Sequence, residues 1–157
     1  MSRNRIELPA TRDQVFDLLL DPYNFPKWVV SAKRIRGVDE DWPRPGSAFY
    51  HASGAGGDVT VKDKTELITM NPPQSLVLQA YLRPLGIVRI RLYLDHGSSL
   101  ETTRLTMVEA PAPGTKLRPF TKLLNPALKV RNRKSLKCLR KLVVETVSGP
   151  ESAATPG

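Results

Sequence analysis

Hydrophobic and polar residues alternate along much of this 157-residue chain up to residue 109. A period of two is typical of β-strands that bury one face. The pattern predicts strands at residues 3–8, 33–40, 47–53, 58–69, 75–83, 86–95 and 102–109. Clusters of proline, glycine, asparagine and serine separate them, and such short connections favour antiparallel pairing. The chain therefore predicts a seven-stranded antiparallel sheet.

Two short helices are expected directly after the first strand. Thr11 and Gln14 have the spacing of a capping box, in which each side chain bonds the other residue's backbone amide. Asp21 and Pro22 then suit the cap and first position of a second helix. Pro26 should end that helix early.

A long helix is expected at residues 115–147, because the period changes there to that of an amphipathic helix. One predicted face is apolar and carries Leu124, Leu128, Leu139 and Leu142. The other is cationic and carries Lys129, Arg133, Lys137 and Arg140. Asn125-Pro126 predicts a kink or a restart. Residues 1–147 are thus read as a single domain, followed by a disordered polar tail at 148–157.

The net charge of +9 belongs mainly to the last predicted helix. Ten lysines and arginines lie between residues 116 and 141, and the rest of the chain has 14 cations against 15 acids. Such a cationic surface suits an anionic membrane or an acidic protein. Nucleic acid is disfavoured, because no aromatic residues are interleaved with the cations on that face.

Cysteine and histidine usage restricts the chemistry further. Cys138 is the only cysteine, which excludes an internal disulfide and fits the reducing conditions of the cytoplasm. With His51 and His96 as the only histidines, no zinc centre is expected, and no motif calls for a cofactor. No signal peptide or membrane span is recognised. Cys138 is expected near the inner face of the last predicted helix, as a small core residue.

Three segments resemble one family. They are residues 6–28 (Ile-Glu-Leu-Pro-Ala at 6–10, Val15-Phe16, and Asp21-Pro22 through Trp28), residues 42–47 (Trp-Pro-Arg-Pro-Gly-Ser), and Arg131-Asn132-Arg133 with Leu136 and Leu139. Together with the order of elements they resemble the START-like (SRPBCC) superfamily, in its polyketide cyclase/dehydrase branch, over roughly residues 3–145. The resemblance implies an α+β helix-grip fold: a curved seven-stranded antiparallel sheet around a long C-terminal helix, with two short helices after the first strand. It also implies a cavity for an apolar molecule.

Strand alternation assigns residues to the cavity side of the sheet. The expected ligand-binding residues are Phe49, Val61, Thr65, Leu78, Ala80, Ile90, Leu92, Leu105, Met107, Leu124, Leu128, Arg131 and Asn132. The same parity places His51, Asp63 and Glu109 inside as ionisable candidates. A histidine and an aspartate on neighbouring strands can act as a general base, although each residue also suits a purely structural role.

These observations favour binding or carriage of a small lipid-like or polyketide-like molecule, by a monomer or homodimer. Cyclase or dehydrase chemistry through His51 and Asp63 is the alternative, so enzymatic activity stays open. A second alternative is docking of the basic helix on a membrane or an acidic protein.

Overall fold

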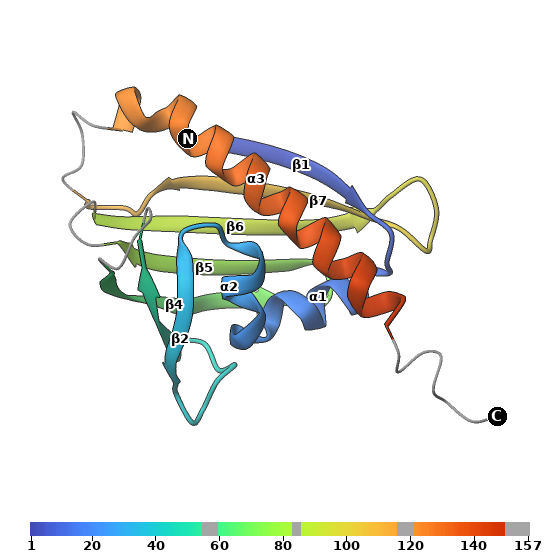
Figure 1. Cartoon of the computed structure of the whole chain (residues 1–157), viewed down its shortest axis with the longest axis horizontal. Coiled ribbons are helices and arrows are strands. Elements are labelled where there is room, and N and C mark those ends of the chain that lie inside the picture. The colour runs from blue at the N-terminus through green and yellow to red at the C-terminus, as the bar shows by residue number, and fades with distance from the viewer. Residues whose placement is uncertain (55–59, 83–85, 116–120, 150–157) are drawn as a thin grey trace.

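The chain folds as one antiparallel sheet that curves around a long helix. The computed structural model describes residues 1–54, 60–82, 86–115 and 121–149, with the side chains of 121–125 left aside. The strands follow one another in the sheet in the order β1-β7-β6-β5-β4-β3-β2. Helix α3 runs obliquely across one face, with the short helices α1 and α2 beside it (Figure 1). This confirms the predicted α+β helix-grip architecture.

The strands lie close to their predicted positions. They are β1 (Ser2–Leu8), β2 (Ala32–Val38), β3 (Ala48–Ser53), β4 (Val61–Asn71), β5 (Ser75–Leu82), β6 (Gly86–His96) and β7 (Thr103–Pro111). Every neighbouring pair is antiparallel, including β1 with β7, which are far apart in the sequence. The sheet therefore has β1 and β2 as its two edges.

The short helices begin at the predicted caps. Helix α1 (Arg12–Leu20) starts at Thr11, and both bonds of the predicted capping box are present. A 3-10 turn, η1 (Pro22–Asn24), starts at Asp21, whose side chain accepts a hydrogen bond from the Tyr23 amide. Helix α2 (Phe25–Trp28) follows directly and buries Phe25 and Trp28.

Helix α3 spans Thr121–Val147 and continues through Pro126, so the chain does not restart a helix at Asn125-Pro126 as one alternative predicted. Its inner face buries Leu136, Leu139 and Val143, which are at most 2% exposed. Predicted helix residues 116–120 and the tail beyond Gly149 lie outside the described residues.

The core lies between the sheet and the helices. Its fully buried large side chains include Leu8, Leu67, Leu76, Leu92, Leu94, Leu105 and Leu139. Trp42 closes one end, because its ring packs edge-on against Phe49 and its Nε1 donates to the Leu20 carbonyl over 2.9 Å. None of the described helices has the length and hydropathy needed to cross a bilayer.

Candidate functional site

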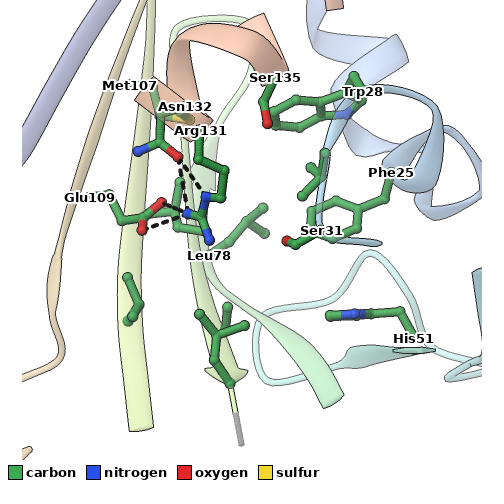
Figure 2. Close-up of a pocket in the computed structure, with 15 residues that line it drawn as sticks. Phe25, Trp28, Ser31, His51, Leu78, Met107, Glu109, Arg131, Asn132 and Ser135 are labelled. Carbon is green, nitrogen blue, oxygen red and sulfur yellow. Dashed lines mark hydrogen bonds and ion pairs between the residues drawn. The ribbon is translucent and has the colours of Figure 1, made fainter. Parts of the chain in front are cut away.

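A cavity remains between the sheet and the helices where the core is incomplete. Its apolar wall comes from β5, β6 and β7, and consists of Leu78, Ala80, Leu82, Val88, Ile90 and Met107. The opposite wall comes from α2 and the turn after it, with Phe25, Trp28, Val29 and Ser31. His51, Glu109, Arg131, Asn132 and Ser135 add polar groups (Figure 2).

The cavity is small in this conformation. Its volume is about 40 Å³, whereas one water molecule needs on the order of 10–15 Å³ by the same measure. Space for a few water molecules is much less than a lipid or a polyketide requires. A ligand of that size would have to separate α2 or α3 from the sheet.

An ion pair forms the polar side of the cavity. The Nη2 of Arg131 donates to both carboxylate oxygens of Glu109, over 2.8 and 2.9 Å. The same guanidinium donates to Oδ1 of Asn132, from Nε over 3.2 Å and from Nη2 over 3.0 Å. Glu109 is 4% exposed and Arg131 27% exposed. Glu109 thus faces inward as predicted, and Arg131 of α3 neutralises its charge.

One nitrogen of the Arg131 guanidinium forms no hydrogen bond to Glu109 or Asn132. Figure 2 shows the remaining nitrogen of Arg131 pointing away from both Glu109 and Asn132. Two further donors in the cavity lining, Nε1 of Trp28 and Nδ2 of Asn132, are buried and have no hydrogen-bond partner among the described residues. The lining therefore offers donors without partners, whereas the carboxylate of Glu109 is already bound.

His51 lines the cavity from β3 and is held on both ring nitrogens. Its Nδ1 lies 3.0 Å from Oγ of Ser53 and its Nε2 lies 2.9 Å from Oγ1 of Thr65. The ring also packs at 5.2 Å from that of Phe25. Burial lowers the pKa of His51, and the negative charge of Asp63 opposes that shift only in part. The neutral imidazole is therefore favoured.

Asp63 lies opposite His51 in the β3–β4 register, so the two share a face of the sheet as predicted. It is 5% exposed. However, it does not line the cavity with His51, but a separate surface hollow with Arg36, Tyr50 and Lys62. The structure thus places both His51 and Glu109 in the lining of the cavity, and Asp63 outside that lining.

Six of the thirteen expected ligand-binding residues line the cavity: Leu78, Ala80, Ile90, Met107, Arg131 and Asn132. The others lie elsewhere. Phe49, Leu92 and Leu105 are buried in the core, and Thr65 is bound to His51. Val61 and Leu128 are half-buried and outside the lining, and the side chain of Leu124 lies outside the described residues. Strand parity predicted correctly which residues face inward, but it did not predict which of them border the cavity.

Sequence reasoning missed the wall that the short helix provides. Phe25, Trp28 and Val29 line the cavity, although none of them was among the expected ligand-binding residues. Ser135, Leu82 and Val88 were also missed. The apolar spacing of Phe25 and Trp28 was visible, but only the packing of α2 against α3 and β2 brings them to the site.

Cys138 is exposed, so its expected place in the core was wrong. It precedes the fully buried Leu139 by one residue, and one residue turns a helix by about 100°. That rotation carries Cys138 to the solvent side. Among the described residues, no group of three His, Cys, Asp or Glu side chains is gathered in a way that could hold a metal ion.

Comparison with protein families gives a match that covers residues 2–144 of the chain. The family is described as polyketide cyclase / dehydrase and lipid transport. No curated protein matches the chain at a significant level.

Solved structures share the fold at low sequence identity. Protein CV1439 from Chromobacterium violaceum is 20% identical, with a TM-score of 0.63 over 90% of this chain and 97% of that one. Ara h 8.0201 is 10% identical, with a TM-score of 0.67 over 91% of this chain and 96% of that one. The di-domain ARO/CYC StfQ from the steffimycin biosynthetic pathway is 11% identical with a TM-score of 0.67, and this chain covers 51% of it.

Proposed function

Because the chain belongs to the polyketide cyclase / dehydrase and lipid transport family, we propose that it binds a small, mainly apolar molecule between the sheet and α3. The observation that carries this proposal is the cavity itself, which has apolar walls on two sides and one ion pair in its lining. Ligand sites commonly combine apolar walls with a few polar groups that fix orientation.

The ligand should carry an oxygen acceptor at one end. The unoccupied nitrogen of Arg131 and the buried donors of Trp28 and Asn132 can each bind a carbonyl, hydroxyl or carboxylate oxygen. Leaving a buried donor without a partner costs about 1–3 kcal/mol. An acceptor on the ligand recovers that free energy, whereas a pure hydrocarbon does not.

The size of the cavity implies that binding widens it. A volume of about 40 Å³ admits only a few atoms, so a lipid-like or polyketide-like molecule must displace side chains of α2 or α3. Binding should then be slower than diffusion allows, because it waits for the wider conformation. Stopped-flow rates that saturate at high ligand concentration would support this sequence of events.

Native mass spectrometry of protein purified from its host is the direct test of the proposal. A co-purifying apolar molecule of defined mass is the expected result. Displacement of a fluorescent apolar probe then allows variants to be compared. Ala80→Leu, which adds side-chain volume in the cavity wall, should weaken probe binding while the protein stays folded.

A matched pair of variants tests the polar end. Arg131→Met removes the donor and keeps most of the aliphatic stem, whereas Arg133→Met makes the same change on the exposed side of the helix. Affinity for an oxygen-bearing ligand should fall about tenfold or more in the first variant, since charged hydrogen bonds contribute about 1.5–3 kcal/mol. Equal affinity of both variants would remove Arg131 from the site.

Catalysis of a cyclase or dehydrase type is the second candidate function. It is favoured by one observation, a buried histidine in the cavity lining. Burial lowers the pKa of His51, which favours the neutral ring that could accept a proton from a bound ligand. Glu109 is the other candidate acid or base among the residues that line the cavity. Turnover of a bound reactive ligand should then fall in His51→Ala, and Asp63→Asn should change it through the charge that acts on His51. Unchanged turnover in both variants would exclude this catalytic role, and ligand binding would remain as the proposed function.

A further inference from the structure

The solvent side of α3 carries a straight stripe of five exposed residues: Val130, Lys134, Lys137, Lys141 and Val144. Their spacing of four, three, four and three residues keeps them on one line along a helix. The stripe lies opposite the buried Leu136, Leu139 and Val143, and spans about 21 Å at 1.5 Å per residue. We call these five residues the outer stripe of α3.

Positive charge dominates both the outer stripe and its flanks. Arg133 and Arg140 on one side of the stripe are exposed, as is Lys129 at its start. Glu145 is the only acidic residue in the sequence between residues 121 and 147. No salt bridge among the described residues neutralises these exposed cations.

Apolar side chains mark both ends of the same stripe. Val130 is 53% exposed and Val144 43% exposed, and Val147 follows at 36%. The helix therefore presents cations in the middle and short apolar side chains at the ends. Cations adsorb to anionic headgroups and apolar side chains enter the boundary with the acyl chains.

We propose that the outer stripe of α3 docks on a membrane surface that contains anionic lipids. The charges are spread evenly along the helix, as a flat anionic surface requires. A protein partner is less favoured, because α3 has no tryptophan, tyrosine or phenylalanine to anchor an interface. The helix lies on the surface with its axis in the membrane plane.

Docking in this orientation has a consequence for the cavity, which rests on the proposed ligand binding. Arg131, Asn132 and Ser135 line the cavity from the opposite side of the same helix. Helix α3 then stands between the bilayer and the bound molecule. Movement of α3 on the membrane would change the cavity wall directly, so docking and ligand exchange are coupled.

Vesicle sedimentation tests the docking. Vesicles of 30% phosphatidylserine in phosphatidylcholine should bind the full chain at 0.1 M salt, and vesicles of pure phosphatidylcholine should not. The variant Lys134→Glu/Lys137→Glu/Lys141→Glu should lower the partition coefficient at least about tenfold, because each cation contributes separately. Salt at 0.5 M should release the wild-type protein, since it shortens the screening length.

A matched control separates the helix from the net charge. Lys33→Glu/Arg34→Glu/Arg36→Glu makes the same change of charge on exposed residues of β2, outside the outer stripe. It should lower the partition coefficient clearly less than the α3 variant does, because these residues are not part of the proposed docking surface. Equal loss in both triple variants would overturn the proposal, because net charge alone would then explain binding.

Two further variants test the apolar ends and the orientation. Val130→Ser/Val144→Ser keeps every charge and should weaken binding about threefold or more, because two apolar side chains that would enter the membrane boundary are lost. Cys138, the only cysteine of the chain, is exposed beside the outer stripe. A fluorophore attached there should shift to the blue on anionic vesicles, while one attached in Cys138→Ser/Lys33→Cys should not.

Three outcomes would overturn the docking. They are absence of binding to anionic vesicles at low salt, equal binding to neutral vesicles, and binding to polyglutamate without binding to vesicles, which would assign the face to an acidic protein. Displacement of the apolar probe from the cavity is measured on the same variants without vesicles. Normal probe binding beside lost docking, or the reverse, separates failure of this proposal from failure of the proposed function.

Discussion

The ion pair between Glu109 and Arg131 should respond unequally to loss of its two members. Glu109 is 4% exposed and Arg131 27% exposed. If Arg131 is removed, the carboxylate is left almost fully buried in the cavity wall without its ion-pair partner. If Glu109 is removed, the guanidinium can still be hydrated on its exposed side and keeps Asn132 as a partner. A comparison of the two single variants therefore tests how the burial of each charge, and not only the contact between the two side chains, affects stability.

The expected magnitudes follow from that difference. Two unit charges about 4 Å apart attract by about 4 kcal/mol at an effective dielectric constant near 20. Removing one partner of a buried pair typically costs about 3–5 kcal/mol. We expect Arg131→Met to lie at the low end, about 3 kcal/mol, because water reaches part of this site. Glu109→Gln should cost only about 1 kcal/mol, since the amide oxygen still accepts a hydrogen bond.

The double variant Glu109→Gln/Arg131→Met completes a thermodynamic cycle. It leaves no uncompensated charge and should cost less than Arg131→Met alone, which gives a coupling energy of about 2 kcal/mol. Urea unfolding followed by circular dichroism measures all four free energies. The loss in Arg131→Met should lower the Tm by about 6–12 °C for a chain of this length.

Arg133→Met is the control, because Arg133 is exposed on the same helix and should stay within about 0.5 kcal/mol of the wild type. The reasoning fails if Glu109→Gln costs as much as Arg131→Met. It fails also if the coupling energy is below about 0.5 kcal/mol, the usual error of additivity. In either case the pair would not fix α3 to β7.

Three further predictions concern single residues. Burial lowers the pKa of His51 in the folded protein. The unfolded state therefore binds the proton first, and the free energy of unfolding should fall as the pH drops below about 6.5. In urea unfolding from pH 7 to 5, His51→Gln should flatten this slope, whereas His96→Gln, at an exposed site, should not. Leu139→Ala, at a fully buried position of α3, should cost about 3 kcal/mol of unfolding free energy, against less than about 0.5 kcal/mol for the exposed Leu100→Ala. Thr11→Ala removes the cap of α1 and should lower the unfolding free energy by about 1 kcal/mol; a change below 0.3 kcal/mol, roughly a third of that value, would contradict the capping role.

Local patterns were sufficient for the elements of the fold. Alternation along β5 marked Leu78 and Ala80 as inward, and both are buried. The capping box at Thr11 formed as its spacing indicated. These features depend on residues within a few positions of one another, so the sequence carries them directly. The inward position of Glu109 followed from the same alternation.

Only the tertiary structure decided which inner residues meet at a cavity. Arg131 reaches Glu109 because α3 crosses β7 at that height, and no local pattern encodes where two elements cross. The same crossing leaves Leu92 and Leu105 in closed core while Ile90 and Met107 border open space. Cavity volume is the small space left after all side chains have packed. It is therefore a property of the whole assembly, whereas the facing of each strand is a property of its own residues.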